Sequence, residues 1–449
     1  MRDIRRATGR GRGALPGPSW LRRGKVAARG WLPVALGLAV IPPAADAQLI
    51  AITGGRVHPV SGPVIENGIV IIRGGRIAAV GGSDTAIPSD AVRVDASGKW
   101  VTPGIVNAIT TLGVVEIGAV LETVDIPARG RGDAITASHR VWDGFNSNSP
   151  LIQVTRNDGI TTVGVVPGGG LVSGQAAVVD LADGSLGEML QRPGVAMVAD
   201  IGSKGPDVGQ SRAEVLQRIR ELLVDTRAYA ARRQDYERNA TREMAARRSD
   251  LEAMIPVVRG QMPLMIEANR ASEIESALEL GREQNIRIMI SGGAEAWMVA
   301  PKLAAARVPV IVGALNNIPL SFAMLGARQE NAGLLQQAGA QVVINGGSDA
   351  FNARNVRFEA GVAVAFGLPW DAALRAVTLT PAEMFGVSDR VGSLQAGRDA
   401  NLVIWSGDPF EPLTRAEAVY VRGQMVSRPS RQDELMQRYR RLPPGYRQR

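Results

Sequence analysis

Short apolar runs cut by glycine-rich turns open the main part of the chain. Residues 49–101 contain Ile50-Ala51-Ile52 and the runs 68–72 and 76–80, each bounded by glycine or polar residues. Turn signals at this density predict a small β-domain. The same texture returns at residues 400–405 and 418–426. The two separated segments can therefore complete one sheet between them.

The middle of the chain alternates strand-like and helix-like runs. This alternation predicts parallel strands that are joined by right-handed helical crossovers. Eight strands fit a TIM-like (β/α)8 barrel of the usual length, and a doubly wound open sheet is disfavoured because no glycine fingerprint follows the first middle strand. The strands are expected at residues 105–108, 160–166, 176–181, 195–200, 264–268, 286–290, 308–312 and 341–344.

These patterns divide the chain into a barrel and a composite β-sandwich. We expect residues 48–102 and 388–428 to form the two parts of the sandwich, and residues 103–387 to form the barrel. Residues 429–449 read as a basic tail. An insertion at about residues 207–258 is charged and lacks glycine from 211 to 258, which predicts a pair of long exposed helices. That pair offers either a partner surface or a solvated helical face.

Residues 1–47 have the organisation of a secretory signal peptide. A basic segment precedes the apolar run 31–41, and Ala45-Asp46-Ala47 is a small-x-small cleavage site before Gln48. The apolar run is shorter than the roughly 20 residues that cross a bilayer, so no stable membrane span is expected. The sequence predicts a periplasmic or secreted protein and leaves the Sec and twin-arginine export routes open.

The positive charge of the chain belongs to this leader. Nine basic and two acidic residues give it a net +7 of the formal +8, which leaves +1 for the remainder. The remainder therefore gives no electrostatic reason to expect a nucleic-acid partner. The chain has no cysteine, so disulfide and thiolate chemistry are excluded.

The first expected barrel strand carries the most specific motif, Pro103-Gly104-Ile105-Val106-Asn107-Ala108-Ile109-Thr110-Thr111. It resembles the amidohydrolase superfamily, in particular its imidazolonepropionase-like branch, where Pro-Gly-φ-φ-Asp-x-His-x-His opens the barrel. The segments 68–81 and 390–405 are similar to the flanking β-domain motifs of the same family. The resemblance covers nearly the whole chain after the leader, and it implies hydrolysis of non-peptide C–N bonds with bound zinc.

The chain departs from that family at the positions of the metal ligands. Ile109 and Thr111 stand where the resemblance implies the paired histidines, and Glu267 and Asn269 follow the fifth strand in place of another. Ser291-Gly292 follows the sixth strand, and Lys204 follows the fourth, where some relatives carry a bridging carboxylated lysine. Only Asp349 matches its family counterpart. Ile109, Thr111, Glu267 and Asp349 are thus the vestigial metal positions.

Zinc needs about four nitrogen, sulfur or carboxylate ligands, and the chain has two histidines. We expect His58 and His139 to be surface or capping residues, and zinc to be absent or weakly bound. The oxygen donors Glu267, Asn269 and Asp349 could alternatively hold calcium or magnesium weakly.

The same strand ends supply the candidate site. A metal-free hydrolase could use Glu267 and Asp349 as an acid–base pair, because neighbouring carboxylates push their pKa values apart. Both acids could equally anchor loops by hydrogen bonding. Candidate substrate-binding residues are Asn269, Arg270, Ser291 and Arg354, and the two arginines could instead pair with Glu267 and Asp349. The glycine-rich segment 168–175 offers backbone N–H groups to an anion or is a plain turn.

Two functions remain open. The first is a hydrolase of small C–N substrates with a rebuilt site. The second is a catalytically inactive relative that binds a small molecule or pairs with an intact amidohydrolase homologue.

Overall fold

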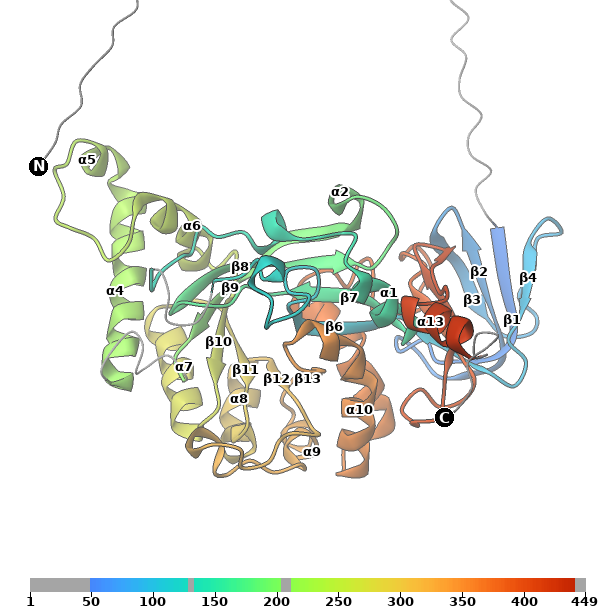
Figure 1. Ribbon diagram of the computed structural model, residues 1–449. Helices are drawn as coiled ribbons and strands as arrows, with labels where there is room; N and C mark the ends of the chain where they lie inside the picture. Colours follow the sequence, from blue (N-terminus) through green and yellow to red (C-terminus); the bar gives the residue numbers. More distant parts are fainter. Residues whose placement is uncertain (1–48, 128–132, 203–210, 441–449) are drawn as a thin grey trace, which may run out of the picture. The chain divides into compact units, whose positions relative to one another are not determined.

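The computed structural model describes residues 49–127, 133–202 and 211–440. The expected signal peptide, 1–47, lies outside the described residues, as do the last residues of the expected basic tail. Two eight-stranded sheets organise the described part of the chain (Figure 1). One belongs to a β-rich domain, and the other forms a nearly closed barrel.

The β-rich domain is built from both ends of the described chain. Its sheet has the order β16-β15-β14-β5-β1-β2-β3, and β4 also pairs with β1. β5 and β14 are antiparallel, with Val101 opposite Ile404, so the prediction of one shared sheet is confirmed. The strands are β1 (Leu49–Val57), β2 (Ile65–Arg73), β3 (Arg76–Gly81), β4 (Val92–Asp95), β5 (Trp100–Pro103), β14 (Leu402–Trp405), β15 (Ala416–Val421) and β16 (Gln424–Met425).

Two tight hairpin turns of this domain pack against each other. Gly74-Gly75 joins β2 to β3 and Arg422-Gly423 joins β15 to β16, all at positive φ, as a two-residue type I′ turn requires. A Cβ on Gly75 would lie 2.8 Å from the Arg422 carbonyl oxygen, and one on Gly423 would lie 2.9 Å from the Gly75 Cα. Only glycine allows the turns to approach this closely.

The barrel sheet contains the eight strands that the sequence predicts, in chain order. They are β6 (Ile105–Thr110), β7 (Ile160–Val165), β8 (Val172–Asp180), β9 (Leu190–Asp200), β10 (Leu264–Ala268), β11 (Ile288–Gly292), β12 (Val310–Val312) and β13 (Val342–Ile344). Strands β9 to β13 are parallel neighbours, and helices connect them. The barrel fold is confirmed.

One strand runs against the expected direction. β8 is antiparallel to both β7 and β9, so the prediction of parallel strands with helical crossovers is wrong at this point. The reason is the connection over residues 166–171, which is far shorter than the dozen residues that a parallel crossover needs. The glycine-rich segment 168–175 therefore contributes residues 168–171 to the hairpin loop between β7 and β8, and its remaining residues begin β8.

The interior of the barrel is apolar. Ala108, Val178, Met265, Met289 and Val343 point into one buried cluster from different strands. Met384 and Phe385, at the end of α12 (Leu379–Met384), join the same cluster. Outward residues of the strands pack in a second, larger cluster against the helices. The alternation of side chains along each strand thus separates an inner from an outer core.

Twelve helices accompany the sheets within the described residues. They are α1 (Pro150–Asn157), α2 (Leu186–Met189), α4 (Arg212–Ala231), α5 (Arg233–Glu237), α6 (Arg248–Val258), α7 (Ala271–Glu283), α8 (Ala300–Ala306), α9 (Asn331–Gln337), α10 (Val356–Ala365), α11 (Trp370–Ala376), α12 and α13 (Arg431–Tyr439). Short 3₁₀ turns include η4 (Phe322–Met324) and η5 (Ala350–Asn355). Within the described ranges, no helix is both long and apolar enough to cross a bilayer.

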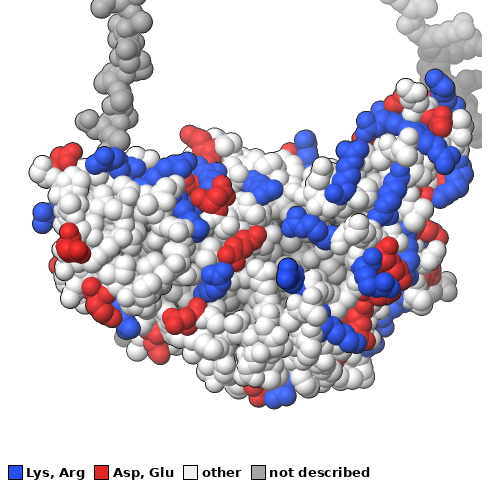
Figure 2. Space-filling view, turned by 180° about the vertical axis from the view of Figure 1, so that it is seen from behind, with Lys and Arg blue, Asp and Glu red and all other residues white. Residues whose placement is uncertain are grey.

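The charged insertion differs from the predicted pair of exposed helices. Only α4 is long, and both α4 and α6 bury an apolar face that includes Leu222 and Met254 in the outer core. Figure 2 shows many basic side chains at this end of the molecule. Ion pairs with acidic residues compensate several arginines of the insertion, such as Arg220 with Glu283 and Arg242 with Asp225. This pairing favours a solvated helical surface over a charged partner site.

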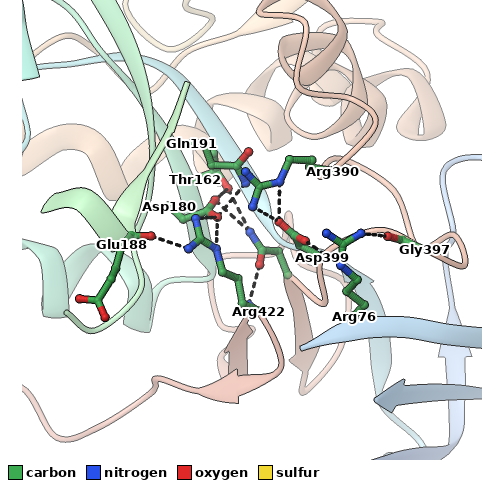
Figure 3. A network of polar contacts seen from close by, with 10 residues as sticks. Arg76, Thr162, Asp180, Glu188, Gln191, Arg390, Gly397, Asp399 and Arg422 are labelled. Atoms are coloured by element: carbon green, nitrogen blue, oxygen red, sulfur yellow. Dashed lines mark hydrogen bonds and ion pairs between the residues drawn. The ribbon is translucent and has the colours of Figure 1, made fainter. Parts of the chain in front are cut away.

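A buried polar network joins the barrel to the β-rich domain (Figure 3). The Asp180 side chain, at the end of β8, is fully buried and accepts hydrogen bonds from Thr162 at 2.8 Å and Gln191 at 2.7 Å. Arg422 donates its Nε to the same carboxylate at 2.9 Å and its Nη1 to the Glu188 carbonyl oxygen. Burial raises the pKa of Asp180, and the Arg422 charge opposes that increase.

Replacing Arg422 by alanine tests this network. Alanine keeps the Cβ and thus the backbone strain at φ 48°, so the change isolates the guanidinium. We expect the free energy of unfolding to decrease by about 2 to 3 kcal/mol, because a buried carboxylate loses its charged partner while its neutral donors remain. Urea unfolding followed by circular dichroism measures this difference.

Arg428→Ala is the matched control, since Arg428 pairs with the half-exposed Asp183. It should change the unfolding free energy by less than about 1 kcal/mol. Equal losses for the two variants would contradict a special role for the buried pair.

Candidate functional site

Three polar side chains in register line the inner face of the barrel at the carboxyl ends of β9, β10 and β11. Asp200 is opposite Glu267, and Glu267 is opposite Ser291. Each follows by two residues an apolar side chain of the interior cluster, namely Val198, Met265 and Met289. Because side chains alternate along a strand, the three polar groups also face inward. We call them the inward polar layer.

The layer is sheltered from solvent. Asp200 is 5% exposed and Ser291 is 7% exposed, while Glu267 is half-buried. The Asp200 carboxylate accepts a hydrogen bond from the Gly202 backbone N–H at 3.0 Å, and neither it nor Glu267 lacks partners. Glu267 and Ser291 were predicted from the sequence, whereas Asp200 was not. The sequence signal for Asp200 was present, because this residue ends an apolar strand and follows the inward-facing Val198 by two residues.

Ile109 and Thr111 form the seam that closes the barrel. The Ile109 N–H donates to the Asn345 side-chain oxygen at 3.0 Å, and the Thr111 N–H donates to the Ser348 carbonyl oxygen at 2.8 Å. The Thr111 hydroxyl lies 3.2 Å from the same carbonyl. These bonds join β6 to the segment after β13, which has no ladder with β6. Ile109 and Thr111 thus both have structural partners across the seam.

Asn269 and Arg270 hold loops at the same end of the barrel. The Asn269 side-chain oxygen accepts from the Ala294 N–H at 3.4 Å. Arg270 donates its Nη2 to the Phe322 carbonyl oxygen at 2.9 Å, which ties the start of α7 to η4. Its backbone N–H donates to the buried carboxylate of Glu273. Arg270 therefore positions a loop in this structure rather than pairing with Glu267 or Asp349.

Asp349 and Arg354 lie on the segment after β13. Asp349 is exposed at the start of η5, and its backbone carbonyl accepts from the Asn352 N–H at 3.0 Å. Arg354 approaches Asp158 at 4.0 Å, so its acidic partner comes from the turn before β7. The expected alternative pairing of Arg354 with Glu267 or Asp349 is not the pairing that the structure has. In the strand register, the acidic residue opposite Glu267 is Asp200.

The two histidines lie outside the inward polar layer. His58 is 3% exposed and stacks on Trp100 at 4.6 Å between ring centroids, with Trp370 at 4.8 Å, so its expected surface position is wrong. Burial, followed by the nearby Arg56 charge, lowers the pKa of His58. His139 is half-buried, and its carbonyl oxygen accepts from the Gln175 N–H of β8.

The donor set at this end of the barrel does not fit zinc. Asp200, Glu267 and Ser291 offer oxygen only, and Ile109 and Thr111 offer neither nitrogen nor sulfur. Among the described residues, no group of three or more His, Cys, Asp and Glu side chains could hold a metal ion. Lys204, the remaining candidate bridge, lies outside the described residues.

Comparisons with known proteins agree with the sequence motifs. Residues 306–427 match the family model described as the amidohydrolase family. The amidohydrolase tasK of Hapsidospora irregularis is 25% identical over 375 residues, which cover 76% of this chain but only 38% of that protein. An imidazolonepropionase of Acidiphilium cryptum is 24% identical over 372 residues, covering 78% of this chain and 89% of that protein.

Solved structures show the same fold. An amidohydrolase from Thermotoga maritima MSB8 has a TM-score of 0.76 at 25% sequence identity, covering 84% of this chain and 99% of that chain. Molinate hydrolase has a TM-score of 0.53 at 17% identity, covering 85% and 95%, and supports the fold alone. The predicted resemblance to the amidohydrolase superfamily is confirmed.

Asn345→Ala tests whether the seam stabilises the barrel. The substitution leaves the Ile109 N–H without its acceptor, so we expect the free energy of unfolding to decrease by about 1 to 2 kcal/mol. Asn148→Ala is the control, because Asn148 is exposed and its change should cost less than about 0.5 kcal/mol. Urea denaturation of the parent and the two variants measures the difference in unfolding free energy. An Asn345 variant as stable as the parent would show that the seam does not stabilise the barrel.

Proposed function

We propose that this chain, which carries an amidohydrolase-family domain, binds a small nitrogenous molecule without zinc-dependent hydrolysis. The observation that carries the proposal is the inward polar layer. Oxygen side chains in register occupy the end of the barrel where the resemblance implies metal ligands. The likeness to hydrolases then describes the scaffold, and the chemistry of this chain follows from the residues that it has.

Without imidazole ligands, a metal hydrolase would lack the tightly bound zinc ion on which its catalysis depends. Bound zinc lowers the pKa of its water and polarises the scissile carbonyl, and oxygen donors alone give no such tightly held ion. At the vestigial positions, the Ile109 N–H and Thr111 instead hydrogen-bond to the segment after β13. The hydroxyl contact supports a structural role for the Thr111 side chain, whereas the Ile109 contact is a backbone bond that other residues could also make.

The side chains of the inward polar layer favour one chemical class of ligand. The carboxylate oxygens of Asp200 and Glu267 are hydrogen-bond acceptors, while the Ser291 hydroxyl can donate or accept. A primary amine or an amide presents N–H donors to such a layer. A carboxylate would meet repulsion from both acids. We therefore assign amines and amides as the ligand class.

A partner chain is the second proposed function. The segment 315–325 exposes large apolar side chains, with Leu320 at 64%, Phe322 at 82% and Leu325 at 62% exposure. Adjacent exposed apolar groups of this size mark protein interaction surfaces. Phe322 is also tied through its carbonyl to Arg270, beside Asn269 of the barrel end. We propose an intact amidohydrolase homologue as the occupant.

The leader over residues 1–47 supports a periplasmic or secreted location for this function. Export would place the protein among small extracytoplasmic amines and amides.

Metal content and ligand binding test the first function. Protein purified without chelator should contain well under one equivalent of zinc and should not hydrolyse amide, lactam or dipeptide substrates when zinc is added. In ligand-observed NMR, benzylamine and benzamide should bind, and Glu267→Gln should weaken benzylamine about tenfold because a charge pair is lost.

Glu275→Gln is the matched control, since Glu275 is an exposed residue that pairs with Lys302 on the outside of the barrel. Benzylamine affinity should be the same in this variant as in the parent. Stoichiometric zinc with turnover would overturn the proposal, as would equal benzylamine affinity in the Glu267 and Glu275 variants.

Co-purification tests the partner. A homologue with an intact His-x-His motif should co-purify with the parent chain, and the double change Leu320→Glu and Phe322→Glu should abolish this, because buried carboxylates are costly in an interface core. Leu413→Glu, at a 94% exposed position on the β-rich domain, should have no effect. Retention of the homologue by the double variant would contradict the assignment of the surface.

A further inference from the structure

The barrel has a cavity at the end opposite the inward polar layer. Its volume is about 430 Å³, and its lining includes Pro263, Arg287, Pro309 and Gln341, which directly precede or closely approach the starts of β10, β11, β12 and β13. These strands are parallel, so their amino ends lie together, whereas Glu267 and Ser291 lie at the carboxyl ends. Small-molecule sites commonly have volumes of roughly 300 to 1,000 Å³.

Part of the cavity wall belongs to the barrel interior. Met289 is 2% exposed and Met384 is 6% exposed, and both are members of the inner apolar cluster. Ile288 and Leu278 add further apolar surface. Methionine side chains adapt to the shape of an apolar ligand, so this wall can accommodate an alkyl chain.

The cavity also carries uncompensated positive charge. Arg282, Arg287 and Arg307 line it together with one acid, Glu383. Glu383 already accepts hydrogen bonds from Arg375, and Arg282 already pairs with Glu279. Within residues 49–127, 133–202 and 211–440, no hydrogen bond or ion pair engages the guanidinium of Arg287 or Arg307. Two cationic groups beside an apolar wall remain available for an anion.

We infer that this cavity binds a small organic anion of the alkanoate class. The carboxylate would lie at Arg287 and Arg307, because a guanidinium matches a carboxylate with parallel N–H donors. The alkyl chain would lie against Met289 and Met384, where burial of apolar area adds to the affinity. An inorganic anion would leave the apolar wall uncovered, and a neutral apolar molecule would leave the two charges without partners.

This site is separate from the proposed amine site. It lies at the other end of the barrel strands and attracts the opposite charge. Loss of one site therefore does not predict loss of the other.

Isothermal titration calorimetry of the full chain with octanoate tests the site. Octanoate should bind saturably at one site per chain. Octanamide, which has the chain without the charge, and inorganic phosphate, which has charge without the chain, should each bind at least about tenfold more weakly. Equal binding of octanoate and octanamide would refute the role of the arginines, and phosphate binding as tight as octanoate would refute the role of the apolar wall.

The double variant Arg287→Ala and Arg307→Gly removes both free guanidinium groups. Arg307 ends α8 at φ 53°, where glycine is the favoured residue, so the fold should be kept. Octanoate affinity should decrease about tenfold or more. Arg93→Ala, on the exposed strand β4, is the control and should bind octanoate as the parent does. Equal affinity in the double variant and the control would overturn the inference.

Methyl-labelled methionine locates the ligand independently of the arginines. In carbon-detected methyl spectra, the signals of Met289 and Met384, assigned through Met289→Leu and Met384→Leu, should shift on octanoate addition. Benzylamine should leave the Met384 signal unchanged. Octanoate shifts confined to other methionines would place the anion elsewhere and refute the site.

Discussion

The barrel depends on the seam between its first and last strands. β6 and β13 have no ladder, so the ring is completed by the Ile109 N–H on Asn345 and by Thr111 on Ser348. Here, neutral hydrogen bonds provide the connection. The seam is thus compatible with isoleucine at position 109 and threonine at position 111.

The two ends of the barrel have opposite chemical character. The carboxyl ends of β9, β10 and β11 present Asp200, Glu267 and Ser291 inward, while the amino ends approach Arg287 and Arg307. An apolar layer that includes Met265 and Met289 separates these ends. Because apolar packing lies between them, the charge at one end does not directly affect ligand recognition at the other end. The scaffold can therefore carry two binding functions that do not compete.

Most of the fold was predictable, because apolar periodicity and the flanking motifs are local signals. All eight barrel strands and the shared sheet of the β-rich domain follow from them. The direction of β8 was missed, although the short connection 166–171 excludes a parallel crossover. The burial of His58 was also missed, because its cover comes from Trp370, which lies far along the chain. At the candidate site, Glu267 and Ser291 were found from motif positions. Asp200 was missed, although it ends an apolar strand, and the register of neighbouring strands places it beside Glu267.

The shared sheet has a consequence for the order in which the protein is made. β5 pairs with β14, but about 300 residues separate them, so the edge of β5 stays unpaired while the barrel is synthesised. An unpaired edge invites association with other chains. The nascent protein must therefore pass through a stage with an open β-edge, and its solubility at that stage depends on how quickly the last strands arrive.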